Sequence, residues 1–326
     1  MMMRPFLSAL AIAGLSLFGA ASGQAQETYP SRPIRIVLPI PAGTALDVVT
    51  RIVGEQISKQ FGQSVVVENR PGAGGALAAQ SVLSAPADGY TLLGGASSVW
   101  TILPAQKNKP SFDVNRDFVQ VALISGITPM YVAVSPRLGI NSFAELVTLA
   151  KSKPGEVVIG TNGAGSLPHF AALALSKRGN IPFNIVPYNQ GGTVAAVSDI
   201  MGGRVHATLE AIFGLRGPMQ TGDLKLVGVM SKERDTLFPD VPVVAVTVPG
   251  FSAIGFMSLA APAGTPAAVV QRLNEAVRLA LESAPVTQRY ADLGITRQIM
   301  TPVETRAFIE GEQAIWWPIV REFEPH

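Results

Sequence analysis

The sequence predicts an α/β protein in which two doubly wound α/β lobes flank a cleft. Three observations lead to this fold class. Strand-like apolar runs alternate with helix-like patterns along almost the whole chain, and the alternation starts a second time near residue 130. The length of 326 residues is enough for about two domains. Such alternation is typical of parallel sheets that carry helices on both faces.

The first unit begins with an apolar run that is expected to form a strand at 34–38. Apolar residues then recur three and four positions apart, which predicts one face of a helix. They are Leu46, Val49, Val53, Ile57 and Phe61. A strand at 64–68, a helix at 76–83 and a strand at 90–93 are expected next. This order of elements implies a parallel sheet.

The second unit repeats this order. Strands are expected at 130–134, 157–160, 183–187 and 205–209. The helices between them are expected at 142–151, 167–178 and 193–201. The tail of the chain is expected to be helical, at 266–283, 286–293 and 302–323.

Two strand-like segments, 119–124 and 255–260, flank the second unit and are expected to cross between the lobes. We therefore assign 29–124 and 252–326 to a discontinuous first lobe, and 125–251 to an inserted second lobe. Open α/β sheets bind ligands beyond the carboxyl ends of their strands. The loops at those ends are therefore the places where a binding site is expected.

The composition excludes several classes of protein. The chain is 48% hydrophobic and 15% charged, which excludes a disordered chain. Lys and Arg exceed Asp and Glu by only 25 − 23, or 2, so nucleic acid is not an expected partner. The absence of cysteine excludes a disulfide scaffold, a thiolate metal site and a cysteine nucleophile. No metal or dinucleotide motif is found, so no cofactor is expected.

The N-terminal segment predicts export. Arg4 precedes an uncharged apolar run, and the small residues Gly23 and Ala25 follow it. This order is typical of a secretory signal peptide, here 1–25, with cleavage after Ala25. A membrane anchor is the alternative, because the apolar run is nearly long enough to span a bilayer. Export of a chain without cysteine suggests the bacterial periplasm.

The loop after the first expected strand is a candidate anion site. It contains Ala42, Gly43 and Thr44, and Asp47 follows in the first turn of the expected helix. Gly43 permits a close backbone approach, and the unpaired N–H groups of a helix N-terminus favour an anion. The same residues also resemble a capping box with Asp in place of Glu, which would serve only the helix. Both interpretations stay open at this point.

Two further loops are weaker candidates. Ser97 lies in a loop expected at 94–98, whose hydroxyl groups are expected to face the same cleft. An ordinary serine-rich turn is the alternative. The loop at 188–192 enters the helix expected at 193–201, and a plain glycine-containing helix entry is its alternative.

The segment 160–169 is the best anion cradle of the second lobe, because it combines three glycines with short polar side chains. Its candidate residues are Thr161, Asn162, Ser166 and His169. Ser166 and His169 also permit a different function, a hydrolase with a serine nucleophile and a histidine base. No G-x-S-x-G elbow surrounds Ser166, which favours a binding protein over a hydrolase.

These loops are also where a family resemblance is found. The chain resembles the Bug-type substrate-binding receptors of tripartite tricarboxylate transporters. The most specific stretch is Val-Val-Glu-Asn-Arg-Pro-Gly-Ala-Gly-Gly at 66–75, followed by Ala-Asp-Gly-Tyr-Thr-Leu-Leu at 87–93. Further matching segments run nearly end to end, at 29–34, 39–47, 163–169, 186–188, 238–242 and 261–266.

The resemblance implies the two-lobed fold of type II periplasmic binding proteins and a receptor without catalysis. Such a receptor would close about a hinge on a small organic carboxylate, aliphatic or aromatic, dicarboxylates included. It would deliver this ligand to the membrane subunits of a tripartite tricarboxylate transporter, and a monomer is expected. A ligand sensor that docks to a signalling partner is an alternative.

The resemblance also implies that the loop at 42–47 and the segment 161–169 line the cleft. The chain departs from the family pattern at Ile40, where an aromatic residue is frequent, and at Glu210, where Asp or Asn is frequent nearby. Both residues are therefore added to the candidate ligand site. A carboxylate beside a carboxylate ligand is unfavourable unless a donor lies between them. Glu210 is therefore expected either to accept a hydrogen bond from the ligand or to brace the fold.

Overall fold

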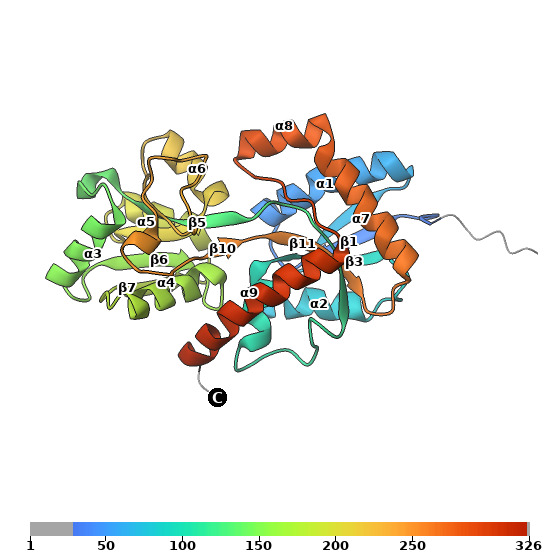
Figure 1. Ribbon diagram of the computed structural model, residues 1–326, viewed down its shortest axis with the longest axis horizontal. Coiled ribbons are helices and arrows are strands. Elements are labelled where there is room, and N and C mark those ends of the chain that lie inside the picture. Colours follow the sequence, from blue (N-terminus) through green and yellow to red (C-terminus); the bar gives the residue numbers. More distant parts are fainter. Residues whose placement is uncertain (1–28, 325–326) are drawn as a thin grey trace, which may run out of the picture.

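Two β-sheets organise the chain in a computed structural model that describes residues 29–324. Figure 1 shows the two sheets side by side, with helix α9 (Pro302–Phe323) running across both. The signal peptide predicted at 1–25 lies outside the described residues. No helix within residues 29–324 is long and apolar enough to cross a membrane.

The first sheet has the strand order β2-β1-β3-β11-β4. Strand β1 pairs in parallel with β2 and β3, as the alternating pattern predicts, whereas β11 runs antiparallel to β3 and β4. The strands are β1 (Ile34–Leu38), β2 (Val65–Asn69), β3 (Thr91–Ala96), β4 (Phe118–Leu123) and β11 (Met257–Pro262).

The two segments expected to cross between the lobes are largely part of this first sheet. Residues 119–124 overlap β4, and residues 255–260 overlap β11. The chain passes between the sheets just beyond them, at 124–127 and at Phe256. The crossing is therefore confined to one end of each segment, because antiparallel pairing of β11 with β3 and with β4 extends the first sheet over the rest.

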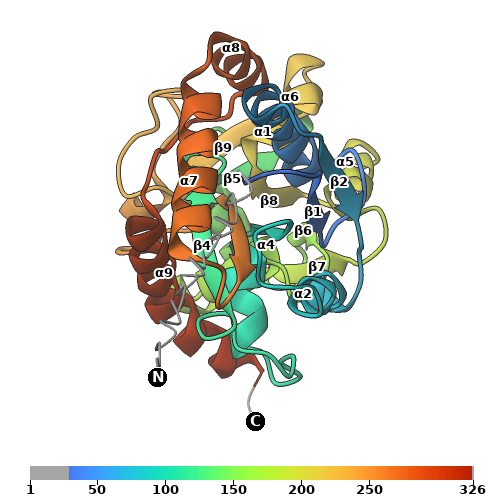
Figure 2. The same ribbon diagram turned by 90° about the vertical axis from the view of Figure 1, so that its right-hand side faces the viewer.

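Helices cover both faces of the first sheet. Alternate residues of β1 point to opposite faces, so that Ile34, Ile36 and Leu38 join one apolar cluster and Val37 joins another. The first cluster is closed by α1 (Ala45–Phe61), α7 (Ala267–Glu282) and α8 (Ala284–Leu293). The second is closed by α2 (Ala76–Leu83) and the first half of α9. Figure 2 shows α1, α7 and α8 grouped together, away from α2.

The second sheet has the order β10-β5-β8-β6-β7, and β9 also pairs with β5. Strand β6 is parallel to β7 and β8, whereas β5 is antiparallel to its partners. The strands are β5 (Thr128–Val134), β6 (Val158–Asn162), β7 (Asn184–Tyr188), β8 (Ala207–Ala211), β9 (Lys225–Val229) and β10 (Ile254–Gly255).

Helices α3 (Phe143–Ser152) and α4 (Leu167–Arg178) pack on one face of the second sheet. Helices α5 (Gly192–Met201) and α6 (Ile212–Gln220) pack on the other. The sequence did not predict α6 or β9. Two glycines and Pro218 lie inside α6 and lower its intrinsic helix propensity.

Helix α9 belongs to the cores of both sheets. Ile309 is part of a cluster on the first sheet, whereas Trp316, Ile319 and Val320 are part of the large cluster on the second. Trp316 is 1% exposed, so this large aromatic side chain is part of the packed core. Because one helix serves both cores, the residue boundaries assigned to the two lobes stay a prediction.

Candidate ligand-binding site

The carboxyl edges of the two sheets meet in this structure. Ser98 lies two residues after the end of β3, and its hydroxyl accepts the backbone N–H of Leu167, the first residue of α4, at 3.1 Å. Phe213, in the first turn of α6, packs against the apolar cluster between the first sheet and α1. The loops that begin α1 and those that begin α4, α5 and α6 therefore border one junction, where α/β sheets bind ligands.

Asp47 stabilises the loop that precedes α1 through hydrogen bonds of its buried carboxylate. It is 3% exposed, and its carboxylate accepts hydrogen bonds from the Gly43 N–H at 2.9 Å, Arg51 Nε at 3.0 Å and Asn69 Nδ2 at 3.0 Å. Burial raises the pKa of Asp47, but these hydrogen bonds outweigh it and hold the pKa below its usual value. The charge of Asp47 is therefore satisfied within its own lobe.

The capping box considered for this loop does not form. Thr44 is the N-cap residue of α1, but its side chain gives the helix no cap, and its hydroxyl donates to the Pro41 carbonyl at 3.0 Å. Gly43, at φ +83°, and Ala42 are exposed, while Ile40 is partly buried. Backbone N–H groups in the first turn of α1 are thus left without a side-chain cap and border the junction.

The prediction of a loop at 94–98 is wrong, because Gly94 and Gly95 lie within strand β3. The absence of side chains there permits close packing. A Cβ atom on Gly95 would lie 2.5 Å from Trp100 Nε1, and one on Gly94 would lie 2.4 Å from a Leu38 methyl carbon. Ser97 is 5% exposed and donates its N–H to the Phe256 carbonyl at 2.9 Å.

The glycine-rich loop before α4 lies at the junction, but its polar side chains are engaged locally. Thr161 is fully buried and donates its hydroxyl to the Asn162 carbonyl at 3.0 Å, while the exposed Asn162 accepts the Gly163 N–H at 2.9 Å. Ser166 caps α4 by accepting the His169 N–H at 3.3 Å. These contacts fix the shape of the loop and leave its backbone at the surface of the second lobe.

The arrangement of Ser166 and His169 is not that of a nucleophile and its base. The His169 Nδ1 atom accepts the Gly165 N–H at 3.3 Å, and no hydrogen bond within this loop joins the imidazole to the Ser166 hydroxyl. Burial lowers the pKa of His169, and Glu324 partly opposes this effect. The hydrolase alternative therefore gains no support from the geometry.

Glu210 lies at the carboxyl end of β8, between the first turns of α5 and α6. Its carboxylate accepts the Thr193 hydroxyl and, at 2.8 Å, the Ala211 N–H. Burial raises the pKa of Glu210, and these two neutral donors only partly offset that effect. Thr193 was not identified from the sequence, although it directly follows the glycine pair at 191–192.

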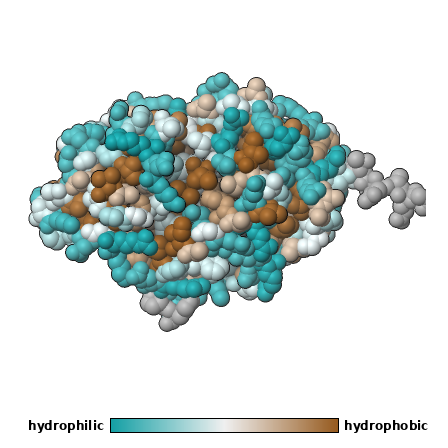
Figure 3. All heavy atoms as spheres, viewed as in Figure 1, coloured by the Kyte–Doolittle hydropathy of each residue, from teal (hydrophilic) through white to brown (hydrophobic). Residues whose placement is uncertain are grey.

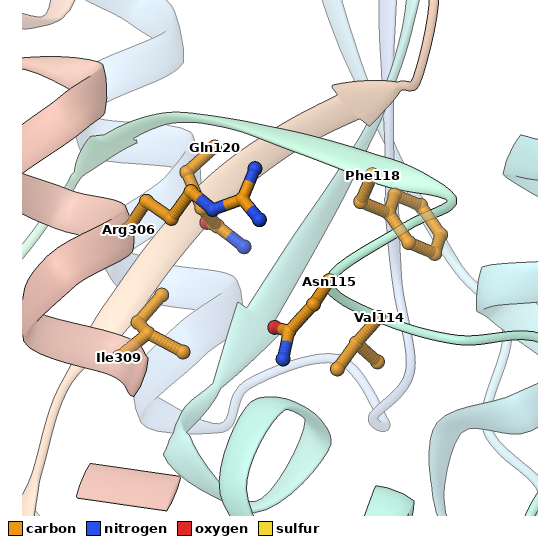
Figure 4. Close-up of a pocket in the computed structure, with 6 residues that line it drawn as sticks. All are labelled: Val114, Asn115, Phe118, Gln120, Arg306 and Ile309. Carbon is orange, nitrogen blue, oxygen red and sulfur yellow. The ribbon is translucent and has the colours of Figure 1, made fainter. Parts of the chain in front are cut away.

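Two recesses in the described chain lie away from this junction. A cavity of about 10 Å³, large enough for about one water molecule, lies between β4 and α9. Figure 4 shows Gln120, Arg306 and the other side chains that line it. An open groove of about 670 Å³ lies between α1 and α7, where Arg272 is placed 5.5 Å from the Phe61 ring centre. On the face drawn in Figure 3, apolar side chains form separate patches among polar ones, some of them near the middle of the molecule.

Comparison with known proteins identifies the family. A family model described as the tripartite tricarboxylate transporter family receptor matches residues 49–324. The chain belongs to this receptor family. Protein BugT of Bordetella pertussis is 34% identical over 318 residues, which cover 96% of each chain. A protein encoded in the tcbD-tcbE intergenic region of Pseudomonas sp. strain P51 is 31% identical over 96% of this receptor and 93% of its own length.

Solved structures agree with this assignment and confirm the predicted fold class. MatC from Rhodopseudomonas palustris, with bound malate, has a TM-score of 0.79 at 29% identity, over 90% of this receptor and 100% of that chain. A second R. palustris protein, with adipate, reaches 0.82 at 27% identity, over 90% and 97%. The periplasmic binding protein BugD reaches 0.79 at 25% identity, over 90% and 98%. The family consists of solute-binding receptors of the periplasm.

Proposed function

We propose that this receptor captures a small organic carboxylate between the facing edges of its two sheets and delivers it to the membrane subunits of a tripartite transporter. The observation that carries this proposal is the contact of Ser98 with the first turn of α4, because it brings the two binding edges together. The carboxylate class is supported by the related proteins solved with malate and adipate.

The anion is held mainly by backbone and helix-terminal dipoles. The segments 39–47 and 160–169 contain no Lys or Arg, and Arg51, which lies beside the first loop, is bound to Asp47 and Asn69. A helix terminus contributes about 0.3–1 kcal/mol, and up to ~2 kcal/mol when partly buried. A hydrogen bond to a charged group contributes roughly 1.5–3 kcal/mol. A micromolar ligand has a binding free energy of about −8.2 kcal/mol. About four contacts of these two kinds, such as two opposed helix termini and two hydrogen-bond donors, together supply that free energy.

Capture involves closure of the two lobes, which we assign to 29–124 with 252–326 and to 125–251. The chain connects the sheets at 124–127 and at Phe256, and α9 packs on both, so that relative motion is confined to this side. Hinge closure about a few connecting residues is the usual motion of periplasmic receptors. The mature chain works as a monomer and presents the closed form to its transporter.

Thermal unfolding of the mature chain, residues 26–326, tests this function. Malate, adipate, hexanoate and benzoate are compared with chloride at equal ionic strength. A ligand at 100 times its Kd stabilises the folded protein by about 2.7 kcal/mol, which gives a clear rise in Tm. Arg272→Gln is the control, because it removes the cation of the α1–α7 groove and should leave the rise unchanged. If no carboxylate raises Tm, or if Arg272→Gln abolishes the rise, the proposal is wrong.

A further inference from the structure

Glu210 brings an acidic side chain without an ion-pair partner to the junction of the two sheets. Its two hydrogen-bond donors, the Thr193 hydroxyl and the Ala211 N–H, are both neutral. Among residues 29–324 no Lys, Arg or His forms an ion pair with its carboxylate. The arginine of α6, Arg216, extends elsewhere, since a Cβ atom on Gly294 would lie 2.7 Å from its Nη1. Glu210 therefore differs from Asp47, whose charge is balanced by Arg51.

The surrounding chain leaves room for this side chain. Gly214 of α6 lies four residues after Glu210, and a Cβ atom at this glycine would lie 2.9 Å from Glu210 Cγ. Glycine in a helix costs about 1 kcal/mol relative to alanine, so its presence here has a packing reason. The first turns of α5 and α6 carry no other side-chain cap, since their N-cap residues are Gly191 and Ala211. The carboxylate of Glu210 thus lies where the N-termini of two helices would otherwise favour an external anion.

Glu210 also lies on the side of the second lobe that meets the first. Phe213, the third residue after it, packs against the apolar cluster of the first sheet. Strand β8 is parallel to β6, so Glu210 lies at the same edge as Asn162 and the start of α4. A ligand anchored by its carboxylate at the first turn of α1 would therefore direct its other end toward this edge.

We propose that Glu210 makes the second-lobe side of the site select an uncharged hydrogen-bond donor, such as a hydroxyl or amide group, and reject a second carboxylate. Two carboxylates within about 4–6 Å repel one another and disfavour ionisation of both. A hydroxyl or amide at the same place donates a hydrogen bond to the glutamate instead, and hydrogen bonds to charged groups are the stronger ones. The favoured ligands are thus ω-hydroxy or ω-amide monocarboxylates, a class that narrows the proposed function on which this inference rests.

Matched ligand pairs test this selectivity directly. Each pair keeps one carboxylate and the chain length, and exchanges the second carboxylate for a hydroxyl: succinate with 4-hydroxybutyrate, glutarate with 5-hydroxypentanoate, and adipate with 6-hydroxyhexanoate. We expect calorimetry of the mature wild-type chain to give a Kd at least tenfold lower for the hydroxy acid of the best-fitting pair. Equal affinities, or tighter binding of the dicarboxylate, would overturn the proposal.

The variant Glu210→Gln removes the charge and keeps the shape of the side chain. We expect it to bind the dicarboxylate of that pair at least tenfold more tightly than wild type does, and a gain in affinity cannot result from misfolding. Glu210→Asp withdraws the carboxylate by about one C–C bond of ~1.5 Å and should give an intermediate ratio of affinities. Glu55→Gln, which neutralises an exposed acid of α1, is the control and should leave the ratio unchanged. An unchanged ratio in Glu210→Gln contradicts the selectivity, whereas failure of every acid to bind contradicts the proposed function itself.

Discussion

The two sheet edges that meet at the junction each carry an acidic side chain, but the hydrogen-bond donors around the two carboxylates differ. At the first edge, Asp47 accepts hydrogen bonds from Arg51, Asn69 and the Gly43 N–H, and its pKa lies below the usual value. At the second edge, Glu210 has only neutral donors, and burial raises its pKa. Asp47 therefore fixes a loop whose other backbone N–H groups stay available to an anion. Glu210 instead presents carboxylate oxygens that accept hydrogen bonds. On the proposed function, the same chemical group would give the two halves of the site different ligand preferences.

The largest effect is expected at Asp47. Asp47→Ala leaves the Gly43 N–H, Asn69 and the Arg51 guanidinium without their common acceptor. We expect the free energy of unfolding to fall by about 2–4 kcal/mol, since hydrogen bonds to a buried charge are lost together. Urea denaturation measures this change. The control is Glu55→Gln in the same helix, whose exposed i,i+4 pair with Lys59 should contribute nothing measurable. Equal stabilities of the two variants would show that Asp47 does not hold the loop.

The space around Glu210 predicts a contrast between two glycines of α6. A Cβ atom on Gly217 has no neighbour within 4 Å, whereas one on Gly214 would lie 2.9 Å from Glu210 Cγ. We expect Gly217→Ala to stabilise the protein by roughly 0.5–1 kcal/mol through helix propensity. Gly214→Ala should lack this gain, and should recover it when Glu210 is also replaced by alanine. A double-mutant cycle measures the coupling, and strictly additive effects would contradict the packing described.

Removal of the N-cap of α4 is expected to cost less stability than Asp47→Ala does. Ser166→Ala removes the acceptor of the His169 N–H, and we expect the free energy of unfolding to fall by about 1 kcal/mol. Ser166→Asn should restore most of this loss, because asparagine is an equally good N-cap residue. Thermal unfolding of both variants and of the wild type measures these differences in stability. Comparable stabilities of the alanine variant and the wild type would indicate that the hydroxyl serves another purpose.

The smallest effect, and the one that separates the two acids most clearly, is the pH dependence of stability. The lowered pKa of Asp47 means that its contribution is present above the unfolded value of about 3.9 and is lost as pH falls through the folded pKa. Glu210 has a raised pKa, so folding favours its protonated form, and its ionisation lowers stability as pH rises above about 4.3.

Urea denaturation between pH 7 and pH 3 distinguishes these two signs. Relative to wild type, Glu210→Gln should be more stable at pH 7 than at pH 4, because it lacks the ionisation that opposes folding. Asp47→Asn should be less stable at pH 7, with a deficit that shrinks as the pH falls below 4. Parallel pH profiles of the two variants would refute the assigned electrostatic roles.

The sequence predicted those parts of the fold that depend on local pattern. Helices at 76–83, 167–178 and 302–323 were predicted with their observed ends, because capping residues such as Ser166 and Thr301 mark where the latter two begin. The prediction of secondary structure was wrong at two glycine-containing segments. Gly94 and Gly95 lie inside a strand because Trp100 and Leu38 fill the space that side chains would take. Helix α6 was missed because its glycines and proline weaken the helical signal.

The candidate site was predicted less completely for a physical reason. Sequence spacing placed Gly43 and Ser166 in loops that follow strands, and the family resemblance added Glu210. Contacts between the two sheets bring these loops to one junction. It did not reveal that Thr193 donates to Glu210, since this contact depends on how two helices pack on the sheet. Nor did it identify Phe213 or the partner of the Ser98 hydroxyl, because these contacts arise only when the two lobes meet.

Hydrogen exchange of the mature chain, followed by mass spectrometry with and without a saturating carboxylate, tests the location of the ligand most directly. The acid with the largest thermal shift is the appropriate probe, and its Kd determines the concentration needed. We predict that slower exchange is confined to the facing segments 39–48, 163–170 and 190–214, since the ligand covers their backbone N–H groups and the lobes close over them. Protection centred instead on the α1–α7 groove, at 60–61 and 268–279, would contradict a binding site between the two sheets.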